Sequence, residues 1–319
     1  MKFSIIVPFY NEGEKMVPLI ESLLRLDKAS QAHEVILVDN KSTDDSVNVA
    51  RKYGFDVEPA PQYASSYYAR NVGASCASGE YLLFIDADCI ADKSLLKQYE
   101  QYIATASRPH RTVFAGGIHP AVNNGNLFEL YAENRKILNQ KSAITGWAYR
   151  PFAQTANALY SREMFLAVGG FHHQMSTGGD AEICWRFADQ CKADFIYAES
   201  AFVRHRHRAD ADSLVAQFQK YGAGRVQQAA LTQEFRNGQK DENFLGKFNA
   251  IAPLLHSLQE QGVRQDDLFQ LLDFIRDSAY ECGIVTEIIK TGKTGKNLSD
   301  VATLHQLLAK RAEDQPCTR

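Results

Sequence analysis

The sequence lacks any stretch approaching the roughly 18 consecutive apolar residues that a membrane-spanning helix needs. The apolar run near the start is too short for a secretory signal, because Asn11 and Glu12 follow it at once. We therefore expect a cytoplasmic protein whose contact with a membrane, if any, is peripheral and on the inner face. The formal net charge is only −3, so no global basic field attracts nucleic acid, and we expect no such partner.

Cysteine and phosphate-loop patterns are missing as well. The six cysteines form no CxxC pair and match no zinc spacing, so we expect reduced thiols of the kind found in the cytosol. No internal repeat or low-complexity tract is present. The GKTGK segment lacks the strand context and spacing of a P-loop, and the stretch Thr291–Lys296 instead predicts an exposed loop.

What is present is the composition of an ordinary globular protein, long enough for more than one domain. Short β-rich runs at Phe3–Val7, Val35–Val38 and Tyr81–Ile85 predict strands, and the helical spacing of apolar residues over Glu14–Leu26 predicts a helix between the first two. Ser42, Thr43 and Asp44 are candidates for the N-cap of a second helix. This alternation predicts a doubly wound, mostly parallel α/β sheet flanked by helices.

Beyond about residue 210 the pattern becomes helical. Leu214, Phe218 and Tyr221 share one helix face, as do Leu268, Leu271 and Ile275. We expect two regions, with the chemistry in residues 1–210 and a helical C-terminal extension in residues 211–319. The extension either contacts a substrate or a membrane surface, or simply packs on the first region.

Polar side chains gather where the predicted strands end. Tyr10, Asn11 and Glu12 follow the first strand, Asp39 ends the second, and the pair Asp86/Asp88 follows the third. Doubly wound sheets bind ligands beyond the carboxyl ends of their strands, so this convergence predicts a site.

The two carboxylates of Asp86-Ala87-Asp88 have two explanations. Leaving them unpaired in the interior would cost several kcal/mol, which a divalent cation would offset, and hard cations favour oxygen ligands. Such a cation could stabilise a nucleotide diphosphate as a leaving group. The alternative is a turn at the end of the strand with solvated carboxylates.

Four blocks together resemble inverting family 2 glycosyltransferases of the GT-A fold, in that family's order and spacing. They are SIIVPFYNE at residues 4–12, VILVDNKSTDDS at 35–46, ARNVGASCASGEYLLFIDADC at 69–89 and TGGDAEICWRF at 177–187. A further block, QTANALYSREMFLAVGGF at 154–171, resembles the segment that lines the acceptor side. The Gln-x-x-Arg-Trp motif of processive members is missing, so we expect addition of one sugar.

The resemblance implies a donor site made of Tyr10, Glu12, Asp39, Arg70 and Asp86. Tyr10 would stack on the donor base, and Asp39 would accept a hydrogen bond from a pyrimidine ring. A carboxylate only accepts, so it suits the ring N–H of uracil or thymine. Arg70 would lie near base and phosphates, and Asp86 near the ribose or metal-bound water. Without the resemblance, Asp39 could be a helix cap or turn residue, and Tyr10 a half-buried loop aromatic.

The resemblance also implies a metal site and a general base. Asp88 would ligate Mn²⁺ or Mg²⁺, and a histidine of the VRHRHR segment would complete the shell, with His205 fitting better than His207. The alternative for that segment is a solvated charge run. Asp180 would be the base that takes the proton of the attacking hydroxyl.

Asp180 could instead be only a helix N-cap. Many relatives carry Glu-Asp where this chain has Gly179-Asp180, so how the acceptor is positioned stays open. Glu182 is the reserve candidate for the base. Arg186 either pairs with Glu182 or faces phosphate.

The predicted function is a metal-dependent, hexosyltransferase-like enzyme. It would move one sugar from a nucleotide-diphosphate donor, UDP or TDP favoured, to the hydroxyl of a saccharide or glycolipid acceptor, as in surface polysaccharide or glycolipid synthesis. One alternative is a sugar nucleotidyltransferase, although residues 4–20 contain only Gly13 where such enzymes carry a Gly-rich loop. The other is a non-catalytic nucleotide-sugar-binding protein of the same fold, which would be expected to have lost its carboxylates.

Overall fold

The computed structural model describes residues 2–27, 33–121, 125–145, 150–232 and 264–294. Eight strands form one sheet: β1 Phe3–Phe9, β2 His33–Asp39, β3 Val57–Pro59, β4 Tyr81–Ile85, β5 Cys89–Ala91, β6 Thr112–Pro120, β7 Asn157–Ser161 and β8 Asp194–His205. The α-helices are α1 Val17–Leu24, α2 Ser46–Lys52, α3 Ser66–Cys76, α4 Leu95–Thr105, α5 Leu127–Asn134, α6 Gln140–Thr145, α7 Arg162–Ala167, α8 Gly179–Cys191, α9 Ala211–Thr232 and α12 Gln265–Thr294. Two short 3₁₀ helices are η1 Gly13–Met16 and η2 Pro109–Arg111.

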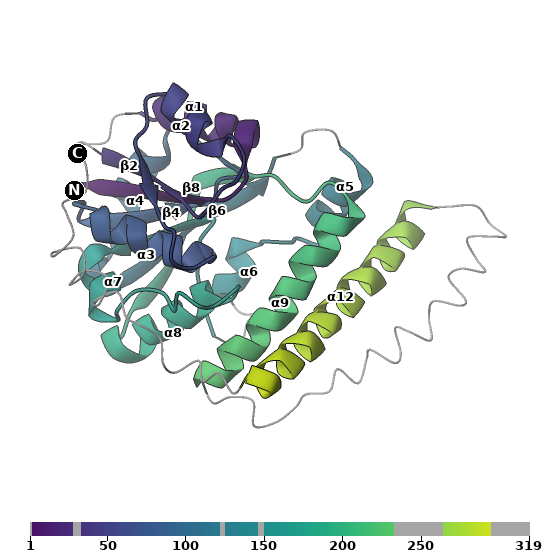
Figure 1. The fold of residues 1–319 in the computed structure, drawn as a ribbon. Coiled ribbons are helices and arrows are strands. Elements are labelled where there is room, and N and C mark those ends of the chain that lie inside the picture. Colours follow the sequence, from purple (N-terminus) through teal and green to yellow (C-terminus); the bar gives the residue numbers. More distant parts are fainter. Residues whose placement is uncertain (1, 28–32, 122–124, 146–149, 233–263, 295–319) are drawn as a thin grey trace.

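The sheet has the strand order β3-β2-β1-β4-β7-β6-β8-β5. Strands β3, β2, β1 and β4 run parallel, β7 is antiparallel to both of its neighbours, β6 and β8 pair in parallel, and β5 is antiparallel to β8. Four of the seven pairings in this sheet are therefore parallel, which confirms the predicted mostly parallel α/β sheet. Helices cover both faces (Figure 1).

Alternation along β1 explains the layers on either side of the sheet. Ile5 and Val7 belong to one core cluster with residues of α1, α2 and α4, whereas Ile6 belongs to the opposite cluster with residues of α3, α7 and α8. Every residue of β1 and β4 is buried. Central strands covered on both faces read as continuous apolar runs, which is why the sequence identified them.

Several local predictions are corrected by the structure. The first helix is preceded by η1, so the regular α-helix begins at Val17 and not at Glu14. The N-cap of α2 is Asp45, while Asp44 bonds the backbone of Ser46 without being the cap. Within Thr291–Lys296, residues 291–294 end helix α12 and do not form a loop, and residues 295–296 lie outside the described residues.

In the described part of the C-terminal region, the long helices α9 and α12 run side by side at the edge of the molecule (Figure 1). Leu214 of α9 packs with Phe269 and Leu272 of α12 against Tyr131 of α5. Of the predicted Leu268/Leu271/Ile275 face, Ile275 packs against this cluster. Leu268 and Leu271 are only half-buried, and the buried positions are Phe269 and Leu272. No helix in the described part of the chain is both long and apolar enough to span a bilayer.

Candidate active site

The loops after β1 and β2 are fastened to one another at the carboxyl end of the sheet. Asn11 adopts a left-handed backbone conformation with φ of 52°. Its side-chain oxygen accepts from the Thr43 N–H at 2.8 Å, and its own N–H donates to Ser42 Oγ at 2.9 Å. The Ser46 hydroxyl accepts the N–H groups of Glu12 and Gly13. This network fixes the segment that carries Tyr10 and Glu12.

Tyr10 and Asp39 lie on neighbouring strand ends. Asp39 is in register with Phe9 across the β1–β2 pair, so Tyr10 follows directly beside it. The Tyr10 side chain is 55% exposed, as a ring that stacks on a ligand has to be before binding. Asp39 Oδ1 accepts the Ser42 N–H at 3.0 Å, which orients the carboxylate. Strand register thus brings the backbone of Tyr10 next to that of Asp39.

Arg70 forms a partly buried ion pair with Asp86. The residue lies in helix α3, which starts with Ser65 as N-cap, and its guanidinium approaches Asp86 Oδ1 to 2.5 Å. The Arg70 side chain is 5% exposed and that of Asp86 is 32% exposed. The Arg70 guanidinium therefore contacts Asp86 from the interior, while part of the Asp86 side chain is accessible to solvent.

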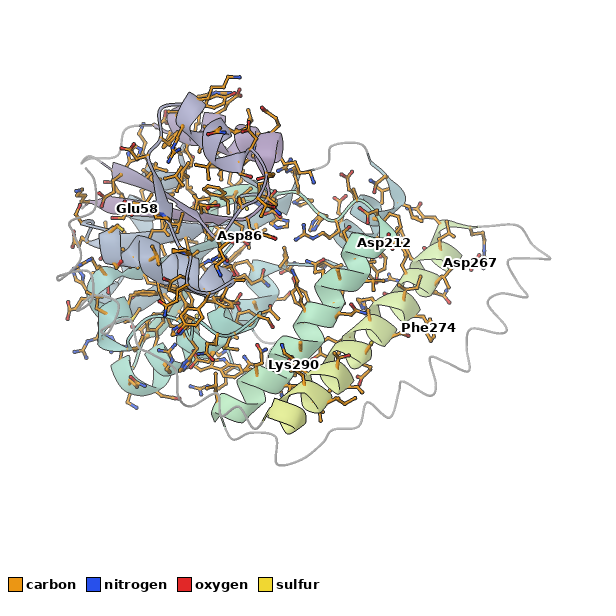
Figure 2. The ribbon with its side chains drawn as sticks, in the orientation of Figure 1. Glu58, Asp86, Asp212, Asp267, Phe274 and Lys290 are labelled. Atoms are coloured by element: carbon orange, nitrogen blue, oxygen red, sulfur yellow. The ribbon has the colours of Figure 1, made fainter. Side chains whose placement is uncertain are left out.

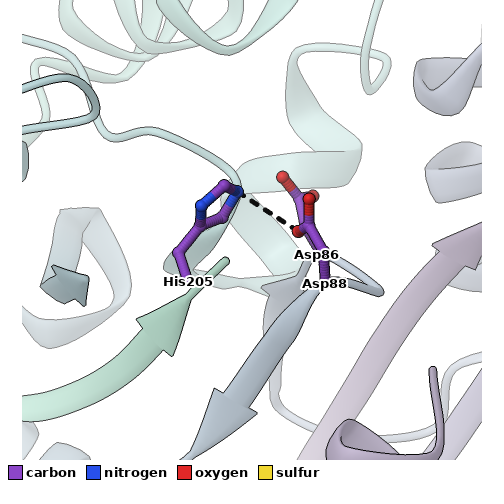
Figure 3. Close-up of side chains that lie close together, drawn as sticks. All are labelled: Asp86, Asp88 and His205. Carbon is purple, nitrogen blue, oxygen red and sulfur yellow. Dashed lines mark ion pairs between the residues drawn. The ribbon is translucent and has the colours of Figure 1, made fainter. Parts of the chain in front are cut away.

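Strand pairing brings Asp88 to His205. Strand β5 follows Asp88 directly, and Cys89 is in register with His205 on the antiparallel strand β8. The Arg206 N–H then donates to the backbone oxygen of Asp88 at 3.0 Å. Asp86, Asp88 and His205 each offer a ligand atom within 4.8 Å of the others, and their side chains point toward one another (Figure 3).

The chemistry of this cluster fits a divalent cation. Two carboxylates and one imidazole are a ligand set that Mn²⁺ accepts, and the carboxylates also suit Mg²⁺. His205 Nε2 is 3.2 Å from Asp88 Oδ1, yet that oxygen is buried and receives no hydrogen bond of good geometry from the described residues. A cation bound at this oxygen would supply the direct partner that it lacks, while the positive charges nearby already favour the ionised carboxylate.

Burial and neighbouring charges shift the pKa values of the ionisable side chains in and beside the cluster. Burial alone would raise the pKa of Asp88, but the charge of His205, with Arg208 and Arg206, lowers it to about 2. Burial would lower the pKa of His205, but Asp88 outweighs it and raises that pKa. Burial and the Asp88 charge raise the pKa of Glu12, which places Glu12 in the same field.

His207 does not join the cluster among the residues that the structure describes. Its ring centroid is 5.5 Å from that of His205, and burial together with the His205 charge lowers its pKa to about 4. Of the two histidines considered from sequence, the structure brings His205 to the acidic pair. Both Arg206 and Arg208 lie close enough to Asp88 to affect its pKa, so VRHRHR is not simply a solvated charge run.

Asp180 lies in the first turn of α8 but is not its cap. The N-cap is Gly178, whose φ of 78° suits glycine, and the Asp180 side chain instead accepts the Ala181 N–H at 3.0 Å. The Tyr67 hydroxyl approaches the same oxygen, Oδ1, at 3.5 Å. Burial raises the pKa of Asp180, and the nearby charge of Asp86 adds to that shift against Arg70. The cap explanation is therefore wrong.

Glu182 is bound into the scaffold. Arg186 binds both of its carboxylate oxygens at 2.6 Å, and His172 Nε2 lies 3.2 Å from Oε1. Burial would raise the pKa of Glu182, but hydrogen bonds from His172 and Arg186 lower it overall. Arg186 also donates to the backbone oxygens of Val168 and Gly170, so it ties α8 to the preceding turn. Of the two sequence alternatives for Arg186, pairing with Glu182 is the observed one.

Tyr67 is a site residue that sequence reasoning missed. It precedes Arg70 by three residues in α3, so both side chains lie on one helix face, and the Arg70 guanidinium is 5.3 Å from the Tyr67 ring centroid. Tyr67 therefore links the Arg70–Asp86 pair to Asp180. The i, i+3 spacing from Arg70 was the available signal.

Comparison with known proteins agrees with this geometry. The family model described as glycosyl transferase family 2 matches residues 4–169. Glycosyltransferase AglE of Haloferax volcanii is 26% identical over 229 residues, covering 70% of this chain and 73% of its own. TarS of Staphylococcus aureus, a poly(ribitol-phosphate) beta-N-acetylglucosaminyltransferase, is 33% identical over 150 residues, which are 46% of this chain but only 26% of TarS.

Two solved structures show the same fold. The mannosyltransferase PcManGT from Pyrobaculum calidifontis, in complex with GDP-Man and Mn²⁺, matches with a TM-score of 0.55 at 16% identity, covering 98% of this chain and 79% of its own. Residues 1–349 of S. aureus TarS, in complex with UDP-GlcNAc, match with a TM-score of 0.50 at 19% identity and cover 93% of each chain. These likenesses confirm the GT-A fold, and the family match, which covers over half of the sequence, places this chain in glycosyltransferase family 2.

Proposed function

We propose that the protein transfers one sugar, with inversion, from a nucleotide-diphosphate donor to an acceptor hydroxyl. The observation that carries the proposal is the Asp86/Asp88/His205 cluster, together with the separate carboxylate of Asp180 in the same electrostatic environment. We further propose that residues 1–210 form the catalytic domain and that residues 211–319 form its C-terminal extension.

The cation-binding part of the site would use Asp86, Asp88 and His205 to hold Mn²⁺ or Mg²⁺. A divalent cation supplies Lewis acidity, which stabilises the negative charge that a diphosphate gains as it leaves. On the protein side, Arg70 holds Asp86 in place, and Arg206 fixes the backbone of Asp88. The basic side chains of Arg206 and Arg208 add positive charge beside the cluster.

Asp180 is proposed as the base. The contacts from Tyr67 and Ala181 both engage Oδ1, which orients the carboxylate so that Oδ2 can accept the proton of the acceptor hydroxyl. Burial raises its pKa, and a higher pKa makes a carboxylate a stronger base. A base on the acceptor side favours attack opposite the leaving group, and hence inversion. Both Glu182 oxygens are already bound by Arg186, and His172 contacts Oε1; the pKa that these contacts lower makes Glu182 the weaker base.

The donor base is proposed to be uracil or thymine. Asp39 accepts hydrogen bonds only, which suits a ring N–H, and the exposed Tyr10 ring can stack on the base. Among the structural neighbours, the TarS complex holds UDP-GlcNAc and the PcManGT complex holds GDP-Man. The fold therefore accommodates both base classes, and the local residues have to decide between them.

The acceptor is proposed to be a saccharide or glycolipid of a surface polymer. TarS, one relative, is by name a poly(ribitol-phosphate) transferase. The cytoplasmic location and the peripheral contact with a membrane stay predictions.

A donor screen tests the function. The protein is incubated with UDP-, TDP-, GDP- and ADP-sugars in Mn²⁺ or Mg²⁺, and release of nucleotide diphosphate is measured with and without EDTA. We expect metal-dependent release of UDP or TDP. Release of pyrophosphate from a sugar phosphate and a nucleoside triphosphate would point to a nucleotidyltransferase, and tight binding of donors without turnover would point to a non-catalytic binding protein.

A further inference from the structure

One face of α9 contacts the segment just before Asp180. Gly224, Gln227 and Gln228 have the i, i+3, i+4 spacing of a single helix face. A Cβ at Gly224 would lie 2.6 Å from the backbone oxygen of Thr177, so only glycine allows this approach. Gln228 Nε2 reaches Gly178 O at 3.4 Å. The helix thus touches the stretch that leads into α8.

Gln227 forms the strongest of these contacts and joins three chain segments. Its Oε1 accepts the Ser176 N–H at 2.8 Å and the Ser176 hydroxyl at 3.1 Å. Its Nε2 donates to Glu287 Oε1 of α12 at 2.8 Å. An ionised Glu287 only accepts, so it fixes which end of the amide faces Ser176.

Helix α12 holds α9 at backbone contact. A Cβ at Gly222 would lie 1.9 Å from Tyr280 O, and one at Gly283 would lie 2.0 Å from Gln219 O. The two helices therefore cross without side chains between them. Glu287 is one turn beyond this crossing and is buried, with 7% of its surface exposed. The crossing therefore fixes the position of the Glu287 carboxylate. If the Gln227 side chain moves, Glu287 does not move with it.

The segment is also held from the opposite side. Ser65, the N-cap of α3, donates its hydroxyl to Met175 O at 3.0 Å. Helix α3 also carries Tyr67 and Arg70. Residues 175–178 are consequently clamped between α3, which packs on the sheet, and the α9/α12 pair, which follows β8 in the sequence.

We propose that Gln227 and Glu287 are positioning residues for Asp180: through Ser176 they set where the start of α8 presents its carboxylate to the acceptor hydroxyl. The inference rests on the proposed function, since it takes Asp180 as the base. It gives the C-terminal extension a role in the chemistry of transfer that goes through the backbone of residues 176–179. Neither side chain touches the substrate.

The chain offers a charge-exchange test. In Gln227→Glu, two carboxylates face each other, which breaks the contact. In Glu287→Gln, the new amide oxygen still accepts from Gln227, so little changes, and the Lys290 contact at 3.9 Å is exposed and weak. In the double variant, which combines both substitutions, the contact only reverses its polarity, because the amide at position 287 can donate to the carboxylate at position 227. Gln219→Glu is the matched control. Gln219 lies on the same helix, and its Nε2 is 3.9 Å from Cys282 Sγ, with no contact of its side chain to residues 175–178 among those described.

Two readouts are measured on the full-length protein. Hydrogen exchange of the amides of residues 176–181 should quicken about 10-fold in Gln227→Glu and return to parental rates in the double variant. Turnover with the donor found in the screen should fall about 10- to 100-fold in Gln227→Glu, because small misplacements of reacting groups cost that much. Affinity for UDP with Mn²⁺ should stay within about twofold. Glu287→Ala should give the same changes to a smaller extent, and it keeps the test valid if Gln227→Glu does not fold.

The outcomes separate the two proposals. Parental turnover in Gln227→Glu and Glu287→Ala, despite faster exchange, would refute positioning. So would a loss that the double variant fails to restore, or an equal loss in Gln219→Glu. A parent protein without turnover would instead count against the proposed function, and the exchange data would still report whether Gln227 and Glu287 hold the loop.

Discussion

The prediction that most directly tests the mechanism is the replacement Asp180→Asn. Gly178 is the N-cap of α8, so the change removes no cap. The asparagine oxygen can keep both contacts of Oδ1, with the Ala181 N–H and the Tyr67 hydroxyl, while the amide nitrogen takes the place of Oδ2. The local structure should therefore survive, and only the basic oxygen is lost.

The expected loss of turnover is about 10²- to 10⁴-fold, the usual contribution of a general base. At about 1.36 kcal/mol for each factor of ten, this corresponds to about 2.7–5.4 kcal/mol in the barrier. Affinity for UDP should not change, because Asp180 is proposed to face the acceptor. In the parent enzyme, turnover should fall as the pH drops through the raised pKa of Asp180, where the carboxylate takes up a proton.

Asp180→Asn should keep or raise the stability of the protein while it lowers turnover. Burial raises the pKa of Asp180 in the folded state, so its ionised form costs folding free energy above that pKa, and the cost disappears below the unfolded value of about 4. Asp180→Asn should thus have a Tm at or above the parental Tm near neutral pH, and the difference should vanish in acid.

Glu182→Gln is the matched comparison, since it makes the same chemical change two residues away. The folded-state pKa of Glu182 is lowered, so its ionised form contributes stability above the unfolded pKa, and this is lost as the pH falls through the folded value. Glu182→Gln should lower the free energy of unfolding by about 1.5–3 kcal/mol, because it loses a charge-assisted hydrogen bond. A folded Asp180→Asn enzyme with near-parental turnover, or a larger turnover loss in Glu182→Gln, would refute the assignment of the base.

Three further outcomes are expected. Asp88→Asn should weaken Mn²⁺-dependent UDP binding in calorimetry at least about 10-fold, with Asp189→Asn as an exposed control; unchanged affinity and metal response would remove the cation from the site. In a competition series of UDP, TDP, GDP and ADP, the two pyrimidine nucleotides should bind best, and Asp39→Asn should reduce the difference in affinity between pyrimidine and purine nucleotides. A preference for GDP or ADP would contradict the proposed donor. Arg70→Met should lower the free energy of unfolding, measured by chemical denaturation, by about 1–3 kcal/mol. This is below the usual range for breaking a buried ion pair because Asp86 is partly exposed, and parental stability would show that the pair is unimportant.

Much of the fold followed from the sequence because the central strands are apolar on both faces and end in polar residues. The positions of Asp39, Asp86 and Asp88 after the strands predicted a ligand site, while the role expected of each came from the resemblance to family 2 glycosyltransferases. The pairing of Cys89 with His205, on strands far apart in the sequence, could not be predicted from spacing. It depends on β5 folding back against β8.

Other features needed backbone geometry or long-range contacts. The cap of α8 was assigned to Asp180 as an alternative because aspartate caps helices well, yet the left-handed conformation of Gly178 takes that position. The predicted α12 face matched the core at Ile275 but not at Leu268 and Leu271, because α12 packs against α9 and against Tyr131 of α5, which local periodicity does not reveal. The contacts among Ser176, Gln227 and Glu287 span 51 and 60 residues and have no motif.

The glycine crossing of α9 and α12 has a mechanical consequence. Figure 2 shows Asp212 at the beginning of α9 and Lys290 near the far end of α12, with the whole length of the pair between them. At Gly222 and Gly283 no rotamer can change the separation of the helices, because backbone meets backbone there. The two helices should therefore move as one rigid body. A displacement of the pair where it contacts α5 would be transmitted to residues 176–178 as a rotation about the crossing. A residue larger than glycine at either position would move this pivot outward, along with everything that the two helices hold.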